Sequence, residues 1–270
     1  MLRIVFVFLL TTVVSSSAYR PVVLMHGIIS NAAGMEELAG WIRTSFPGTY
    51  VRSIEIGNGK TDSFLMPINK QIEEFCGTIY SDDQLRQGFN LLGYSQGSMI
   101  VRGAVERCSL PVYNLITLSG LHQGIFGIPY LLQLPEEYRE LITKYAYEYQ
   151  VQNLVSSANY WHDPYQLDKY ISDCNFLPDI NNEGEARNEI YLIVPKESGW
   201  FMGYKPNSLD VETWNNSRQF TEDLIGLRTL WEQGKIFTFT SHVRHQDVTH
   251  EPNRDFILEN IFPFFNNTIS

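Results

Sequence analysis

Short apolar runs alternate with amphipathic segments through the first half of the chain. Four runs rich in aliphatic and β-branched residues predict buried strands: Tyr19–His26, Tyr50–Ile56, Phe89–Gly93 and Val112–Leu118. The segments between them predict helices: Met35–Thr44, Ile68–Tyr80 and Gln96–Arg107. Short glycine-containing turns join strand to helix, so the pattern predicts an α/β fold with a mostly parallel sheet and helices on both faces.

The alternation stops between about residues 125 and 180. Helical and aromatic segments replace it, including Pro135–Ser156 and Tyr160–Pro164. An insertion above the carboxyl edge of an α/β sheet is where a substrate lid lies, so residues 125–180 are predicted to form a helical cap.

Strand character returns after the cap. Ile190–Val194 and Lys235–Thr240 are predicted strands, and Arg254–Phe262 is a predicted final helix. The sequence has no internal repeat and no low-complexity linker. Residues 19–270 are therefore predicted to be one domain that carries the cap.

The first 18 residues are typical of a secretory signal peptide. Arg3 precedes an apolar run over Ile4–Leu10, and small residues follow at Ser15–Ala18. The run is too short to span the roughly 30 Å of a bilayer's hydrocarbon core. We expect cleavage after Ala18, a lysosomal or secreted protein, and no transmembrane segment.

Charge and composition narrow the possible partners. Thirty acidic against 20 basic side chains give a net charge of −10, which disfavours binding to nucleic acid. Aromatic residues make up 13% of the chain, which indicates apolar binding surface. Two N-x-S/T sequences predict glycosylation at Asn215 and Asn266 in a secreted chain. Three cysteines allow one disulfide and leave one thiol over.

The sequence Gly93-Tyr94-Ser95-Gln96-Gly97 fits the G-x-S-x-G pattern of a serine nucleophile. It lies between a predicted strand and a predicted helix, where a sharp turn raises the serine hydroxyl above the sheet. In this arrangement the backbone N–H of Gln96 and one from the loop His26-Gly27-Ile28 stabilise the oxyanion. The alternative is a strand–turn–helix junction with a solvent-facing serine.

A serine hydroxyl needs a base, and histidine has a suitable pKa. In α/β hydrolases the base follows the last strand, and three histidines follow Lys235–Thr240: His242, His245 and His250. Spacing alone does not choose among them. His26 precedes the serine, contrary to the expected order, so we interpret it as a residue that shapes its loop.

Several motifs together make the chain resemble the palmitoyl-protein thioesterase family, lysosomal α/β hydrolases that remove fatty acyl groups from cysteine. The resemblance extends from about Tyr19 to Phe264 and rests on six motifs. They are Pro21-Val22-Val23-Leu24-Met25-His26-Gly27, Gly93-Tyr94-Ser95-Gln96-Gly97, His122-Gln123-Gly124-Ile125-Phe126-Gly127, Tyr160-Trp161-His162-Asp163-Pro164, Phe176-Leu177-Pro178-Asp179-Ile180-Asn181 and Trp200-Phe201.

The resemblance implies roles for individual residues. Ser95 is the nucleophile, and Ile28 and Gln96 provide the oxyanion N–H groups. A histidine 11 residues after Gly234 selects His245 as the base. The resemblance also implies a disulfide between Cys76 and Cys108, which leaves Cys174 outside the bridge.

The triad acid departs from the family pattern. The family's aspartate stands five residues before a proline that precedes the Trp-Phe pair, and that count from Pro195 gives Ile190. Relative to the family pattern, the chain is also shorter by some 15–20 residues between Asn181 and Pro195. Either the strand and its aspartate are absent, or Ile190–Val194 is the strand and Glu197 is the acid.

The sequence therefore predicts a serine thioesterase that acts on S-fatty-acylated proteins, peptides or small acyl-thioesters, with no cofactor and no metal. The aromatic insertion is the expected lining for the acyl chain. Two alternatives remain: a lipase or carboxylesterase on the same fold, and a non-catalytic acyl-binding relative that has lost its triad acid.

Overall fold

The computed structural model describes residues 19–126, 137, 144–182, 192–195, 201–202, 205–208 and 210–267. The predicted signal peptide at residues 1–18 and the proposed acid Glu197 lie outside this part of the chain.

The described strands form one parallel sheet of six, in the order β2-β1-β3-β4-β5-β6. Their bounds are β1 Val22–Met25, β2 Val51–Ile54, β3 Phe89–Tyr94, β4 Val112–Leu118, β5 Leu192–Pro195 and β6 Phe237–Phe239. Every predicted strand is confirmed: β4 has the predicted bounds, and the ends of the others differ from the prediction by up to three residues. The sequence prediction at Ile190–Val194 thus corresponds to β5, which pairs with β4 and β6.

The strand order reverses at β1, whose two neighbours are β2 and β3. In open α/β sheets, ligands bind beyond the carboxyl ends of the strands at such a reversal, where the two connections leave in opposite directions. The loops that follow β1 and β3 therefore flank the position at which a binding site is expected.

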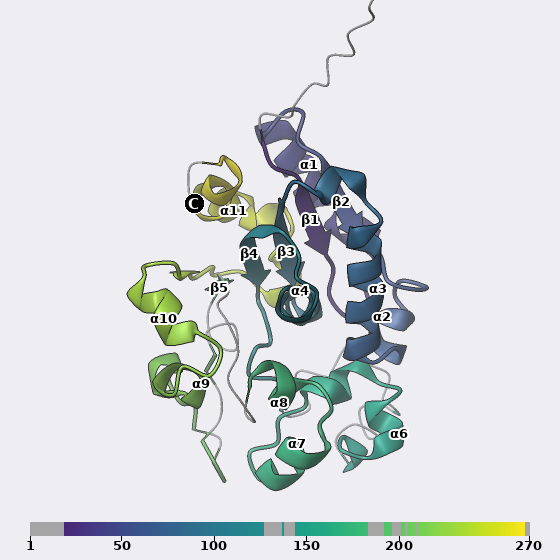
Figure 1. The fold of residues 1–270 in the computed structure, drawn as a ribbon, viewed down its shortest axis with the longest axis vertical. Coiled ribbons are helices and arrows are strands. Elements are labelled where there is room, and N and C mark those ends of the chain that lie inside the picture. Colours follow the sequence, from purple (N-terminus) through teal and green to yellow (C-terminus); the bar gives the residue numbers. More distant parts are fainter. Residues whose placement is uncertain are drawn as a thin grey trace, which may run out of the picture.

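Four helices cover the sheet, two on each face (Figure 1). They are α1 Glu36–Ser45, α3 Ile68–Tyr80, α4 Gln96–Arg107 and α11 Arg254–Asn260. Val22 and Leu24 of β1 pack with residues of α1 and α11, whereas Val23 and Met25 pack with residues of α3 and α4. All four β1 side chains are fully buried, which explains why this strand is apolar throughout rather than alternating.

Shorter helices lie outside the sheet layers. The described ones are α2 Asp62–Leu65, α6 Tyr149–Gln152, α7 Leu167–Asp173, α8 Leu177–Ile180, α9 Arg218–Thr221 and α10 Leu227–Glu232. Figure 1 shows α6, α7 and α8 grouped at the lower end of the view.

In the described part of Pro135–Ser156, residues 137, 144 and 145 are helical, α6 covers Tyr149–Gln152, and a 3₁₀ helix follows at Ser156–Tyr160. The prediction for the last helix was too long. The last helix ends at Asn260 and not at Phe262, and a 3₁₀ helix follows at Phe262–Phe265. Pro263 lacks a backbone N–H, so it cannot extend the α-helical ladder.

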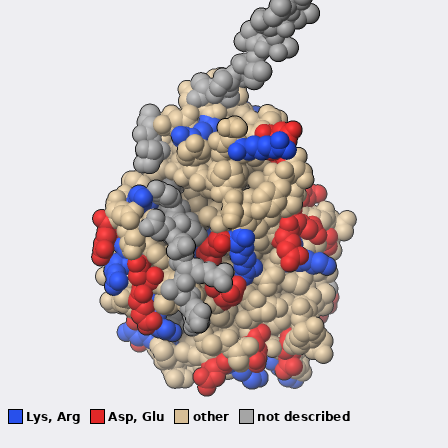
Figure 2. Space-filling model, in the orientation of Figure 1, with Lys and Arg blue, Asp and Glu red and all other residues tan. Residues whose placement is uncertain are grey.

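The described surface carries side chains of both charge signs. On the face drawn in Figure 2, acidic and basic side chains of the described residues are interspersed rather than separated by sign. Within the described ranges, no helix is long and apolar enough to cross a bilayer.

A disulfide joins Cys76 of α3 to Cys108 at the end of α4, as the resemblance implied. It links the two helices on the same face of the sheet, which lie on either side of β3 in the sequence. Cys174 is outside the bridge: it is buried, and its thiol contacts the carbonyl oxygen of Asn159 at 3.1 Å.

Replacement of both bridge cysteines by serine should lower the free energy of unfolding by about 3–4 kcal/mol. The bridge closes a loop of 32 residues and restricts the unfolded chain. Urea unfolding of Cys76→Ser/Cys108→Ser against the wild type measures the loss. A loss below about 1 kcal/mol, or linked peptides containing Cys174 in a non-reduced digest, would contradict this assignment.

Candidate active site

Ser95 lies on a sharp turn between β3 and α4. Its backbone has φ 55° and ψ −123°, a conformation that residues with a Cβ rarely adopt. A Cβ at Gly93 would approach the backbone of Gly97 within 2.6 Å, and a Cβ at Gly97 would lie 2.4 Å from the carbonyl oxygens of Met25 and His26. Only glycine fits these two positions, which gives the G-x-S-x-G sequence a structural cause.

The loop after β1 passes directly against the nucleophile. A Cβ at Gly27 would lie 3.1 Å from Ser95 Cβ and 3.6 Å from its Oγ. The glycine therefore allows the backbone that leads to Ile28 to approach the serine closely. The candidate oxyanion loop and the candidate nucleophile are neighbours, as the strand order requires.

His245 is the histidine that reaches the serine. It begins a short 3₁₀ helix after β6, and its Nε2 lies 2.9 Å from Ser95 Oγ. His250 is at the surface instead, with its Nδ1 2.6 Å from a carboxylate oxygen of Glu37. His242 lines a cavity beside His245. The structure thus distinguishes among three histidines that spacing alone left open.

Burial lowers the pKa of His245 below its ordinary value of 6.5. The neutral imidazole is therefore favoured, and its Nε2 can accept the proton of the Ser95 hydroxyl. The nearby carboxylate of Asp247 pairs with Arg244 at 2.8 Å. Among the described residues, no carboxylate is hydrogen-bonded to His245.

Tyr94, the residue before the nucleophile, contacts the base directly. Its hydroxyl donates a 2.6 Å hydrogen bond to the backbone carbonyl of His245, and the two rings lie 5.3 Å apart. Burial, with a smaller effect from Asp247, raises the pKa of Tyr94 above its ordinary value, so the hydroxyl keeps its proton. Sequence analysis missed this residue, because the pattern leaves its position unspecified.

Two backbone N–H groups are available beside Ser95. That of Gln96 is the first of α4 and has no intrahelical acceptor. That of Ile28 makes no hydrogen bond within the described part of the chain. Both belong to segments that lie against the serine.

His26 is buried and fixes the same loop. Burial lowers its pKa, so the ring is neutral, and its Nδ1–H donates to the carbonyl oxygen of Gly27 at 2.8 Å. The Gly27 carbonyl and the Ile28 N–H belong to one planar peptide unit. The hydrogen bond therefore also orients the Ile28 N–H, which agrees with the sequence interpretation of His26.

A cavity of about 350 Å³ adjoins His245. Segments at the ends of β4 and β6 and the start of α11 line it, through Leu118, Ser119, Thr240, Ser241, His242, Val243, His245, Val248, Asn253 and Phe256. None of these residues comes from the insertion at 125–180. This cavity therefore does not test the expectation that residues 125–180 line the acyl-binding site.

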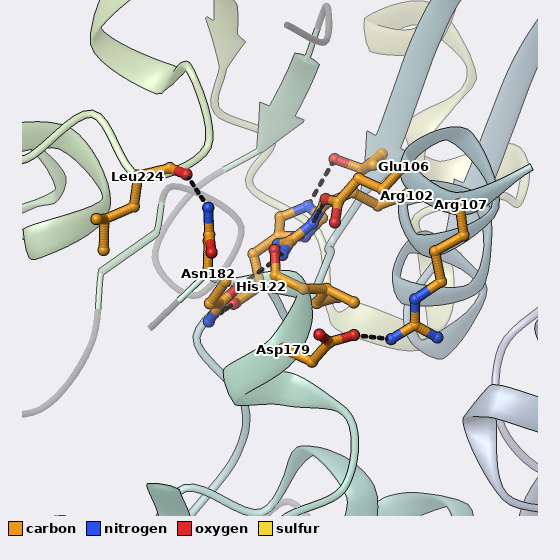
Figure 3. Close-up of polar contacts among 10 residues, drawn as sticks. Arg102, Glu106, Arg107, His122, Asp179, Asn182 and Leu224 are labelled. Carbon is orange, nitrogen blue, oxygen red and sulfur yellow. Dashed lines mark hydrogen bonds and ion pairs between the residues drawn. The ribbon is translucent and has the colours of Figure 1, made fainter. Parts of the chain in front are cut away.

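A buried polar network holds α4 against the segments that follow β4 and α8 (Figure 3). Arg102 is 2% exposed, and its guanidinium binds Glu106 at 2.9 Å. It also donates to the carbonyl oxygen of Ile180 at 2.7 Å and to Asn181 Oδ1 at 2.6 Å.

His122 extends this network to β4. Burial and the charge of Arg102 hold its pKa well below the ordinary value, so the ring is neutral. Nδ1 then accepts from Arg102 at 3.2 Å, and Nε2–H donates to Thr117 Oγ1 at 3.1 Å. The ring stacks on Phe201, with centroids 4.9 Å apart. The network fixes the carboxyl end of β4, next to the strand that carries Ser95.

Comparison with known proteins agrees with this geometry. The sequence model of one family, described as palmitoyl protein thioesterase, matches residues 21–245. The chain belongs to this family. Membership confirms the resemblance found in the sequence and, with it, the prediction of a thioester hydrolase.

Individual relatives match over most of their length. Palmitoyl-protein thioesterase 3 of Dictyostelium discoideum is 40% identical, over 93% of this chain and 91% of that protein. Palmitoyl-protein thioesterase 1 of Caenorhabditis elegans is 34% identical, over 80% and 83%. The lysosomal thioesterase PPT2 homolog of Drosophila melanogaster is 33% identical, over 92% and 93%.

Solved structures support the fold. A lipase-esterase related protein from Clostridium acetobutylicum aligns with a TM-score of 0.50 and 16% identity, over 91% of this chain and 94% of that one. The NocB thioesterase domain, in covalent complex with a fluorophosphonate analogue, aligns with a TM-score of 0.50 and 12% identity, over 92% and 95%. The α/β-hydrolase fold predicted from sequence is confirmed.

Two neighbouring arginines of α4 should differ sharply in their contribution to stability. Arg102→Met leaves Glu106 and the Ile180 carbonyl without their buried donor, and should cost about 3–5 kcal/mol. Arg107 also pairs with a carboxylate, that of Asp179, but both side chains are partly exposed, so Arg107→Met should cost about 1 kcal/mol or less. Urea unfolding of both variants measures the difference, and equal losses would contradict the network.

Proposed function

We propose that this enzyme hydrolyses the thioester of S-fatty-acylated proteins, peptides or small acyl-thioesters, with Ser95 as nucleophile and His245 as base. The observation that carries the proposal is the 2.9 Å contact between Ser95 Oγ and His245 Nε2 on the strained turn. The names of the relatives, palmitoyl-protein thioesterases among them, support the substrate class.

The proposed first half-reaction forms an acyl-enzyme. His245 Nε2 takes the Ser95 proton as Oγ attacks the thioester carbonyl carbon, and the carbonyl oxygen becomes an oxyanion. The N–H groups of Ile28 and Gln96 stabilise that charge. The tetrahedral intermediate then collapses, the C–S bond breaks, and the leaving thiolate takes the proton from His245.

The second half-reaction releases the fatty acid. A water molecule gives a proton to His245 Nε2 and its oxygen attacks the acyl carbon, so the oxyanion forms again at the same two N–H groups. When the intermediate collapses, Ser95 Oγ leaves and recovers the proton from His245. The serine hydroxyl and the neutral histidine are then restored for the next cycle.

Glu197 remains the proposed triad acid. It follows β5 by two residues in the sequence, and β5 ends at the same edge of the sheet as β3 and β6. A carboxylate at that edge can hydrogen-bond to Nδ1 of the base histidine, hold its tautomer and stabilise the imidazolium. Glutamate replaces aspartate in some enzymes of this fold.

The insertion at residues 125–180 is the proposed cap and acyl-chain lining. Its described part contributes Trp161, Tyr165 and Phe126 to one aromatic cluster, with ring centroids 5.4 and 6.1 Å from that of Phe126. Tyr165 is exposed and Phe126 is half-buried, whereas Trp161 is buried behind them. The apolar surface of the first two rings can bind a fatty acyl chain at roughly 0.8 kcal/mol for each buried CH₂ group.

A lysosomal or secreted location completes the proposal. Relatives named lysosomal thioesterases support it, as does the signal-peptide pattern at residues 1–18. Asn215 is exposed in a short 3₁₀ helix, where a glycan can extend into solvent, whereas Asn266 is half-buried. We keep both as proposed glycosylation sites.

Ser95→Ala should reduce kcat for a palmitoyl thioester by about 10⁶-fold, since the hydroxyl forms the covalent intermediate. Ser172→Ala, at an exposed serine of α7, is the matched control and should retain wild-type kcat. Fluorophosphonate labelling of the wild type, but not of Ser95→Ala, checks that the serine is activated.

Residual kcat within tenfold of wild type in Ser95→Ala would refute the nucleophile. A parallel assay with the matched oxygen ester separates a thioesterase from a lipase or carboxylesterase. A wild type that binds acyl groups but is neither labelled nor active would be the non-catalytic relative.

The pH profile should report the buried base. Since burial lowers the pKa of His245, its neutral form persists to more acidic pH, and kcat/KM should rise with pH about a midpoint below 6.5. His250→Gln, at a surface histidine paired with Glu37, should leave that midpoint unchanged. A midpoint at or above pH 7 would contradict the assignment.

Glu197→Gln tests the acid. If Glu197 holds His245, kcat should fall by about 10²-fold or more, whereas Glu222→Gln at the surface should have no effect. A change below about threefold in an active, folded variant would exclude Glu197 from the triad.

A further inference from the structure

The side chain of Gln96 is fully committed to hydrogen bonds that the proposed chemistry does not use. It is 1% exposed, and its Nε2 donates to the backbone carbonyl oxygen of Ser63 at 2.6 Å. Its Oε1 accepts from the hydroxyls of Ser156 at 2.8 Å and Tyr160 at 2.9 Å. One amide therefore joins the start of α4 to α2 and to the insertion at 125–180.

Ser63 connects the same amide to the loop after β1. Its Oγ accepts a 2.7 Å hydrogen bond from the backbone N–H of Ile29 and donates to the carbonyl oxygen of Lys60 at 2.8 Å. Ser63 is 1% exposed. The residue that receives the Gln96 amide at its carbonyl thus holds the oxyanion loop with its hydroxyl.

The held segment is strained. Ile29 has φ 54°, a left-handed conformation that is a genuine outlier for a β-branched residue. Such strain costs about 1–3 kcal/mol and persists only where surrounding contacts enforce it. The Ser63 hydroxyl is one such contact, and Ile29 directly follows Ile28, whose N–H is the second proposed oxyanion donor.

We propose that the Gln96 side chain is a positioning residue that holds both halves of the oxyanion hole in register. The first half is its own backbone N–H at the start of α4, and the second is the Ile28 N–H, held through Ser63 and Ile29. The same amide ties this geometry to Ser156 and Tyr160 of the insertion. The inference rests on the proposed function in one respect, the assignment of these N–H groups to the oxyanion.

The physical consequence follows from burial. Without the amide, the Ser63 carbonyl loses its shortest hydrogen bond and keeps those from Gln71 Nε2 at 3.2 Å and Ser156 Oγ at 2.9 Å. The buried Tyr160 hydroxyl loses its acceptor, and the Ser156 hydroxyl is left with the Ser63 carbonyl alone. Unsatisfied buried groups are costly, so the segments shift to find new partners. The strained backbone at Ile29 can then relax and turn the Ile28 N–H away from Ser95.

Substitutions at Gln96 separate its side chain from its backbone N–H. Gln96→Met keeps the N–H and the length of the side chain but removes every side-chain hydrogen bond. We expect kcat for a palmitoyl thioester to fall about 10- to 100-fold with KM within about threefold, because misplaced donors weaken only the transition state. The rate of fluorophosphonate labelling at Ser95 should fall in parallel.

Gln96→Glu should change the pH dependence of activity, an effect that a loss of stability alone does not produce. Its carboxyl can still accept from the cap hydroxyls, but it can donate to the Ser63 carbonyl only when protonated. The activity of this variant relative to wild type should therefore rise as pH falls. A ratio that is independent of pH would overturn the proposed role of that donor.

Ser63→Ala tests the second half of the hole by removing one hydroxyl, and it keeps the test valid if Gln96→Met does not fold. It should also lower kcat and labelling, and the loss in the double variant with Gln96→Met should be smaller than the product of the two single losses.

Asn114→Ala is the matched control: it removes a buried amide that donates to Asn90 and Phe264, near the opposite end of β4. It should lower the thermal midpoint and leave kcat unchanged.

Unchanged kcat and labelling in folded Ser63→Ala would overturn the proposal. So would equal kcat losses in Asn114→Ala and Gln96→Met. If wild type is labelled at Ser95 but cleaves no thioester, the proposed substrate is wrong, while the labelling ratios still test Gln96. If wild type is neither labelled nor active, both proposals fail.

Discussion

The close approach of the backbones at the ends of β1 and β3 determines the geometry of the site. At this point Ser95 adopts a positive φ, and the side-chain-free surfaces of Gly93, Gly97 and Gly27 let three chain segments meet. A Cβ at Gly93 or Gly97 would overlap neighbouring backbone atoms, so neither turn nor loop could keep its position. The serine hydroxyl, the start of α4 and the loop that carries Ile28 are neighbours because of this contact.

Such packing needs support, because it stores backbone strain. The support comes from buried polar groups rather than from apolar contacts alone. Gln96 and Ser63 hold the turn on one side, and Tyr94 fixes the carbonyl of His245 on the other. Farther along α4, the hydrogen bond between Arg102 and His122 supports the helix in the same way. Tyr94 is half-buried, and the other four side chains are buried, where an unmade hydrogen bond is expensive.

Sequence patterns predicted the parts that depend on local periodicity. The bounds of α3, α4 and β4 coincide with the predicted Ile68–Tyr80, Gln96–Arg107 and Val112–Leu118, because a regular apolar face or a continuous apolar run marks each of them. The G-x-S-x-G pattern located the turn for the same reason, because local steric contacts allow only glycine at Gly93 and Gly97.

The remaining features depend on contacts between distant segments. Tyr94 meets His245 across 151 positions, and Gln96 meets Tyr160 across 64, so no pattern within one segment could indicate either pair. Choosing His245 over His250 from the residues alone was impossible for the same reason, since His250 finds its partner in Glu37, 213 positions away. Turns in the insertion also depend on tertiary contacts, such as that of Ser156 with Ser63.

The central claim is that one site, built from the ends of β1, β3 and β6, stabilises the charge that develops on the carbonyl oxygen. The crystal structure of the protein inactivated by a long-chain fluorophosphonate tests it most directly. The account predicts phosphorus bonded to Ser95 Oγ and its oxygen about 2.7–3.1 Å from the backbone nitrogens of both Ile28 and Gln96. An oxygen directed to solvent, or a phosphonyl group on another residue, would contradict it.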